Sequence, residues 1–175
     1  MLNMMLLLLG LLTASPDHIP ATVDSAPQLS VKLAQVQQSN PKPITEFESM
    51  GEVSLYDDRE SVVRKKGEPL SINKDVYSGY TEYHYKDITV GLSEDLVYYV
   101  HMHMDESTGA WAGVIQLNGQ WLPLQKQEIT QALGEPDFKA EDGDVYIRDL
   151  AAIKIYRHPT TKAIVGVDLF DTIAF

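Results

Sequence analysis

A recurring tripeptide constrains the fold of this chain more than any other feature of its sequence. Gly67-Glu68-Pro69 occurs again as Gly134-Glu135-Pro136, 67 residues further along. In each copy a β-branched residue, Val62 or Ile129, stands five residues before the glycine. Self-similarity at one fixed spacing is typical of a structural unit that is used more than once. The sequence therefore predicts two tandem repeats.

Each tripeptide predicts the end of a short helix. Glycine adopts the left-handed conformation that commonly closes a helix, and the proline two residues later cannot continue it. In the first copy Asp57 or Asp58 can cap the opening turn, and Lys65 and Lys66 suit the negative end of the helix dipole. The second copy has Gln125 where the first has Asp58, so we expect a weaker start for the second helix.

The segments that follow each tripeptide are typical of β-strands, because they are rich in Tyr, Val, Ile and Thr and are separated by turn residues. We expect strands within residues 80–92, 96–102, 145–148, 152–157 and 163–170.

The predicted fold class is α+β, with repeats at residues 50–117 and 118–175. Each repeat would consist of a short helical segment followed by an antiparallel β-meander. Neither meander alone would bury enough apolar area to be stable, so the two sheets should join or pack together in one compact domain.

The first 49 residues predict an exported chain. Met4–Leu12 is an apolar run followed by small residues, which is typical of an export signal over residues 1–15. The run is shorter than the roughly 20 apolar residues that span a bilayer, although an uncleaved membrane anchor stays open because no Lys or Arg precedes it. Residues 16–49 are rich in Pro, Ser and Gln, as linkers are. Within them Leu29–Gln38 fits a helix or a strand.

Composition excludes several classes of function. The formal net charge of −11 argues against a nucleic-acid partner, which would need clustered Lys and Arg. The chain has no cysteine, so disulfides, thiolate chemistry and a lipidated cysteine are all impossible. Motifs for zinc proteases, serine hydrolases, nucleotides and dinucleotides are absent too. We therefore expect no cofactor and no enzymatic activity, with an unrecognised hydrolase as the weakest option.

The two Gly-Glu-Pro segments, with their apolar anchors and the strands that follow, resemble the β-lactamase-inhibitor-protein-like architecture. That architecture includes the SmpA/OmlA-type envelope domains and a group of secreted Gram-positive proteins of unknown function. The resemblance covers residues 50–175. It implies an exported binding or scaffold module, secreted or otherwise extracytoplasmic, that acts without catalytic residues.

One strand separates two kinds of side chain by strict alternation. Side chains at Leu96, Tyr98, Val100, Met102 and Met104 should point to one face, and those at Val97, Tyr99, His101 and His103 to the other. The first set is the more apolar, so we assign it to the core. We likewise expect Tyr83 and Tyr85 of the preceding strand to line the core.

The second face predicts the functional residues. If the sheet brings the two strands together, its candidate partner-binding residues are Tyr80, Glu82, His84, Tyr99, His101 and His103. Tyrosines and histidines on a strand offer rigid amphipathic contacts to an extracytoplasmic protein partner. The alternative is an extracytoplasmic metal-binding protein that uses His101 and His103, since imidazoles two residues apart on a strand can share one ion. A membrane would be involved only through an uncleaved signal.

Export gives the first testable prediction. The mature chain should begin after Leu12 and before Gly51, because a signal peptidase cleaves behind the apolar run and the linker tolerates trimming. N-terminal sequencing of the protein from its native host measures this directly. Recovery of a chain that still starts at Met1 from the cytoplasmic fraction would contradict the prediction.

Overall fold

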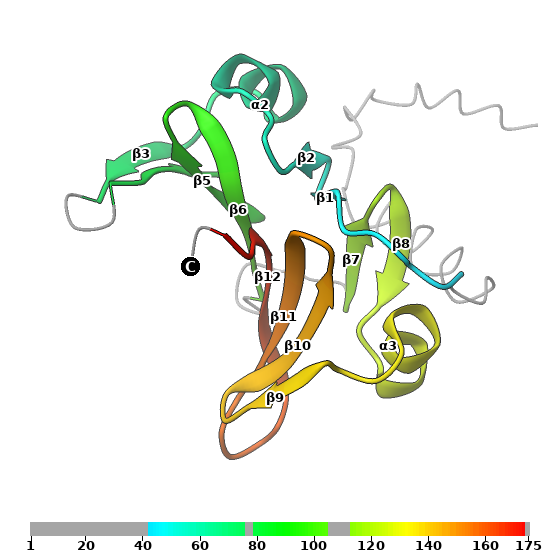
Figure 1. Ribbon diagram of the computed structural model, residues 1–175. Coiled ribbons are helices and arrows are strands. Elements are labelled where there is room, and N and C mark those ends of the chain that lie inside the picture. The colour runs from blue at the N-terminus through cyan, green and yellow to red at the C-terminus, as the bar shows by residue number, and fades with distance from the viewer. Residues whose placement is uncertain (1–41, 76–78, 105–112, 174–175) are drawn as a thin grey trace, which may run out of the picture.

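The computed structural model describes residues 42–75, 79–104 and 113–173. The predicted export signal, most of the linker, including Leu29–Gln38, and the last two residues lie outside the described residues. The described chain is built mainly from β-strands, arranged in two antiparallel sheets with two short helices (Figure 1). Neither of the two described helices has the length and apolar character needed to cross a membrane.

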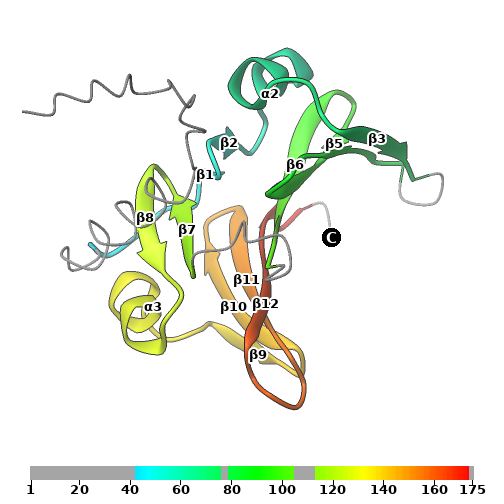
Figure 2. The same ribbon diagram turned by 180° about the vertical axis from the view of Figure 1, so that it is seen from behind.

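The smaller sheet has four strands in the order β2-β1-β7-β8. These strands are β1 (Ser49–Met50), β2 (Val53–Ser54), β7 (Val114–Leu117) and β8 (Gln120–Pro123). The helices α2 (Arg59–Lys66) and α3 (Lys126–Leu133) each follow one hairpin of this sheet. Figures 1 and 2 show α2 beside the β5–β6 hairpin and α3 beside β8.

The larger sheet has eight strands in the order β3-β4-β5-β6-β12-β11-β10-β9. Their bounds are β3 (Ser71–Lys74), β4 (Thr81–His84), β5 (Ile88–Ser93), β6 (Leu96–His103), β9 (Phe138–Ala140), β10 (Gly143–Arg148), β11 (Ala151–Arg157) and β12 (Ile164–Asp171). The strands expected from β-branched and aromatic runs are therefore present.

The predicted fold class, an α+β pair of helix-plus-meander repeats, is wrong. Each helix has only eight residues, whereas strands dominate both halves of the described chain. Strands from the two halves also pair directly with one another. β1 pairs with β7 in the small sheet, and β6 pairs with β12 in the large one. The hairpins before the helices were missed because strands of two to four residues are too short to show a pattern of alternation. The boundaries proposed at residues 49 and 117 stay predictions.

The predicted helix ends are confirmed. Gly67 and Gly134 follow the two helices with φ of 79° and 78°, a region that residues with a side chain rarely adopt. The Asp58 carboxylate caps α2 by accepting a hydrogen bond from the Ser61 amide at 2.7 Å. No side chain caps α3 at Gln125, in agreement with its weaker start signal.

One hydrophobic cluster joins both sheets and both helices. Its fully buried members include Met50 and Leu122 from the small sheet, and Val62 from α2. The large sheet contributes Val100 and Leu169. The face of the large sheet that carries these two residues is its inner face, and the opposite side is called the outer face below. Burial of apolar side chains from every layer is the main source of stability.

The end of the predicted linker also belongs to this core. Ile44 is 8% exposed and Phe47 is 5% exposed. The Ile44 amide donates to the carbonyl of Ala132 in α3 at 2.8 Å. Residues 44–47 therefore connect the start of the described chain to the second helix.

A β-bulge corrects the predicted alternation along β6. Tyr99 pairs with Gly91, but Val97 pairs with Leu92, so Tyr98 is the extra residue on its strand. Because a bulge adds one residue to a strand, the side chains before it point to the opposite face from the one that strict alternation predicts. Val97 is consequently fully buried and Leu96 is 38% exposed, the opposite of the expectation. The alternation holds beyond the bulge.

Core truncation gives the second prediction. Ile129→Ala, or Val62→Ala, should lower the free energy of unfolding by about 1–4 kcal/mol, because each removes buried methyl groups and leaves a cavity. Denaturant titration followed by circular dichroism provides the measurement. Gln131→Ala, at an exposed position of the same helix α3, is the matched control and should change stability little. Equal stability of the Ile129 variant and this control would show that α3 does not anchor the core.

Candidate functional site

The outer face of the large sheet brings the predicted site residues together. His84, Thr89, His101 and Asp168 are direct neighbours across β4, β5, β6 and β12. Glu82, Gly91 and Tyr99 form the next row. Directly paired residues of antiparallel strands point to the same side, so these side chains share one surface. His103 is exposed there, while Tyr99 and His101 are half-buried.

Thr89 connects two of the histidines. Its hydroxyl lies 3.0 Å from Nδ1 of His84 and 2.8 Å from Nε2 of His103, and the residue is only 4% exposed. A hydroxyl has one proton to donate, so if one ring nitrogen accepts it, the other ring must donate its N–H to the hydroxyl oxygen. The two imidazoles, 19 residues apart in sequence, are thus held through one buried side chain.

Tyr99 lies across the sheet and reaches a carboxylate two strands away. Its hydroxyl donates to Oε1 of Glu82 at 2.5 Å, and Glu82 Oε2 lies 3.3 Å from Nε2 of His84. The ring passes over Gly91, where a Cβ atom would come within 2.0 Å of the ring. Burial, followed by this hydrogen bond, raises the pKa of Tyr99, so the phenol stays protonated in neutral solution.

Asp168 completes the network and was missed from the sequence. One carboxylate oxygen contacts Nδ1 of His101, and the other accepts a hydrogen bond from the Tyr156 hydroxyl at 2.7 Å. Lys154 lies over the Tyr156 ring, 4.3 Å from its centroid. The sequence did contain a signal for Asp168, which is a carboxylate inside an otherwise apolar strand. An ionised group in such a place usually has a partner.

Four tyrosines form a continuous series of ring contacts that starts at Tyr99 on this face and leads to Tyr56. Tyr56 contacts Tyr98 at 6.2 Å between centroids, Tyr98 contacts Tyr80 at 6.3 Å, and Tyr80 contacts Tyr99 at 5.5 Å. The bulge explains why Tyr98 takes part. Tyr98 was expected in the core with Tyr83 and Tyr85, which are indeed only 6% and 9% exposed.

The histidine pair was also the candidate metal site. The rings of His101 and His103 are close, with centroids 4.6 Å apart. However, His101 Nδ1 faces Asp168 and His103 Nε2 faces Thr89. Over residues 42–75, 79–104 and 113–173, no group of three or more His, Asp or Glu side chains is arranged to hold a metal ion.

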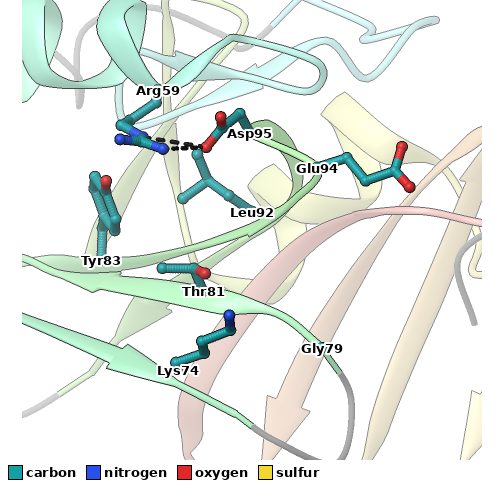
Figure 3. A pocket seen from close by; sticks show the side chains of 8 residues that line it. All are labelled: Arg59, Lys74, Gly79, Thr81, Tyr83, Leu92, Glu94 and Asp95. Carbon is teal, nitrogen blue, oxygen red and sulfur yellow. Dashed lines mark hydrogen bonds and ion pairs between the residues drawn. The ribbon is translucent and has the colours of Figure 1, made fainter.

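A polar pocket of about 330 Å³ opens on the inner side of the sheet, between the start of α2 and strands β3 to β5 (Figure 3). Arg59 donates from Nε and Nη2 to Oδ1 of Asp95 at 3.1 and 2.6 Å. Lys74 and Glu94 add one charge of each sign. Because its charges balance, this pocket indicates no class of ligand.

Comparison with known proteins identifies no family. No family model and no curated protein matches the chain. Solved structures with weak similarity include an extracellular protein containing an SCP domain from Bacillus anthracis and a cysteine-rich secretory protein from Staphylococcus aureus. Both have a TM-score of 0.43, with 15% and 13% identity, and each match covers 77% of this chain and 49% of the other. The chain therefore spans about half the length of these two proteins.

A third similar structure is a DUF4309 family protein from Bacillus subtilis. It has a TM-score of 0.43 and 12% identity, and the match covers 83% of this chain and 97% of that protein. Similarity this weak assigns neither a family nor an activity to the chain.

The contact between Tyr99 and Gly91 gives the third prediction. Gly91→Ala should lower the free energy of unfolding by about 1–3 kcal/mol, because the new methyl group displaces the Tyr99 ring. In a Tyr99→Ala background the same substitution should cost much less. Denaturant titration of the four proteins gives the coupling energy between the two positions. Equal costs in both backgrounds would mean that the ring does not lie over this glycine.

Proposed function

We propose that this chain is an exported, non-enzymatic protein-binding module, and that its outer face binds an extracytoplasmic protein partner. The binding residues would be Tyr80, Glu82, His84, Tyr99, His101 and His103. The observation that supports this proposal is the side-chain network on that face. Hydrogen bonds, together with the contact between the His101 and His103 rings, link amphipathic side chains on four neighbouring strands into one connected surface.

Such a network favours protein recognition for two physical reasons. Side chains that are already held by hydrogen bonds lose little conformational entropy when a partner binds. Tyrosine combines a large apolar ring with a polar hydroxyl, which makes it one of the residue types enriched in binding hot spots. Glu82 and Asp168 have hydrogen-bond partners within the network, so covering this face does not bury an uncompensated carboxylate.

Export and the resemblance to inhibitor-type and envelope proteins belong to the same proposal. They rest on the apolar run at Met4–Leu12 and on the Gly-Glu-Pro segments. An exported module of this kind would inhibit its partner or serve as a scaffold in the envelope. The alternative use of His101 and His103 as metal ligands is retained as an outcome of the test.

Partner capture tests the function and gives the fourth prediction. The tagged chain, expressed in its native host and cross-linked there, should capture a specific extracytoplasmic protein. Tyr99→Ala and the double variant His101→Ala, His103→Ala should each lose that protein, because each removes part of the surface. His158→Gln, which changes an exposed histidine in the turn before β12, is the matched control and should retain it.

Calorimetric titration of zinc and copper into the purified protein distinguishes the metal-binding alternative from the proposed protein-binding function. Stoichiometric metal binding at submicromolar concentration, abolished in the double histidine variant but not in His158→Gln, would support the metal-binding function. Capture that is unchanged in both outer-face variants would contradict the proposed surface.

A further inference from the structure

A second surface lies where the two sheets meet, away from the histidines. A groove of about 460 Å³ runs between the chain around β1 and β2 and the turn that connects β10 with β11. It is lined by Glu46, Phe47, Glu48, Ser54, Leu55, Tyr56, Arg148, Asp149, Leu150 and Ala151. We call it the inter-sheet groove. Figures 1 and 2 both show the β10–β11 turn ending next to β1.

The lining of the groove includes several apolar side chains. Phe47 belongs to the core, whereas Leu150 and Tyr56 are 55% and 48% exposed. The Tyr56 hydroxyl donates to Asp171 at 2.7 Å, and Asp171 is itself 3% exposed. This hydrogen bond is the main reason that the pKa of Tyr56 is raised to about 12, and it fixes the ring as one wall. Asp149 and Leu150 form a two-residue turn that leaves the leucine projecting from the sheet.

Charge in the groove is predominantly negative. Glu46, Glu48 and Asp149 are exposed, and none of them forms an ion pair with any residue in the described part of the chain. The single lining cation, Arg148, is engaged elsewhere. Its guanidinium donates to Asp137 at 3.3 Å and to the carbonyls of Ile147 and Leu133 at 2.6 and 2.7 Å. It also lies 5.4 Å above the Phe47 ring.

We propose that the inter-sheet groove binds a basic peptide segment of a partner protein, with one large apolar side chain against Leu150, Leu55 and Tyr56, and flanking Lys or Arg residues beside the three carboxylates. Apolar contact in a preformed groove supplies affinity, and charge complementarity favours a partner segment with positive charge. A second copy of this chain fits poorly, because a net charge of −11 makes like-charge approach unfavourable. The proposal does not depend on the outer face.

Peptide titration of the full chain tests this proposal and gives the fifth prediction. The probes are three capped tripeptides, acetyl-Lys-Phe-Lys-amide, acetyl-Lys-Ala-Lys-amide and acetyl-Glu-Phe-Glu-amide, added to ¹⁵N-labelled protein. We expect amide shifts around residues 46–48, 54–56 and 149–151 with the first peptide, with a Kd on the order of 1 mM. The other two peptides should bind at least about fivefold more weakly, because one lacks the apolar contact and the other has the wrong charge.

Variants with matched controls locate the site. Leu150→Ala should weaken binding of acetyl-Lys-Phe-Lys-amide about fivefold, whereas Leu70→Ala, at a 77% exposed leucine outside the groove, should not. The double variant Glu46→Gln, Glu48→Gln should weaken binding of this peptide and reduce the salt dependence of binding. The control double variant Glu60→Gln, Glu141→Gln changes the net charge equally and should have neither effect. The His101→Ala, His103→Ala variant should bind as the unmodified chain does.

Three results would overturn the proposal. The first is an absence of shifts up to about 10 mM peptide, a range that reveals interactions of only a few kcal/mol. The second is equal affinity for the acidic and basic peptides. The third is binding that Leu150→Ala leaves unchanged. The leucine and glutamate variants change exposed side chains and His101 is half-buried, so dispersed amide spectra will confirm that each variant is folded.

Discussion

The antiparallel pairing of β6 with β12 is the contact on which the rest of the structure depends. It joins strands that lie more than 60 residues apart in the sequence, so the chain must close a long loop before this pairing contributes stability. Core packing offsets that cost. Leu169 pairs with Val100 and Val167 pairs with Met102, and Val100, Leu169 and Val167 are fully buried. Without this pairing the eight-stranded sheet would separate into two four-stranded pieces with exposed edges.

The same pairing arranges the chemistry of the outer face. Because side chains alternate, the register that buries Val100 and Leu169 places His101 opposite Asp168 on the other side. Glycines then leave room for large rings to lie flat. Gly91 lies beneath Tyr99, and a Cβ atom at Gly166 would come within 3.1 Å of the His101 ring. Core packing and the polar network are therefore two consequences of one register.

Much of the local structure could be predicted from the sequence, but the way in which its parts combine could not. The helix ends at Gly67 and Gly134 were predictable because backbone conformation and proline chemistry act over a few residues. The larger strands followed from alternation and composition. Short strands carry no such pattern, so the four-stranded sheet and its pairing of β1 with β7 were not foreseen. The bulge at Tyr98 was equally hidden, because one inserted residue depends on a partner strand rather than on its own neighbours.

The residues of the candidate site likewise fall into those that could be predicted from the sequence and those that could not. Alternation placed Glu82, His84, Tyr99, His101 and His103 on one side of two strands, since that depends on local geometry alone. Asp168 and Thr89 are residues of neighbouring strands that hold those side chains, and only the register shows which side chains they lie beside.

The two candidate surfaces differ most in how their carboxylates are satisfied. On the outer face, Glu82 and Asp168 accept hydrogen bonds from tyrosine hydroxyls, so a partner there gains mainly from shape and apolar contact. In the inter-sheet groove, Glu46, Glu48 and Asp149 form no ion pair with any described residue, and their field extends to an approaching partner. Screening by salt therefore acts chiefly on the groove, over a Debye length of about 8 Å at physiological ionic strength. The two proposed surfaces therefore differ in kind: binding at the outer face would depend on fixed geometry, and binding in the inter-sheet groove would depend on charge.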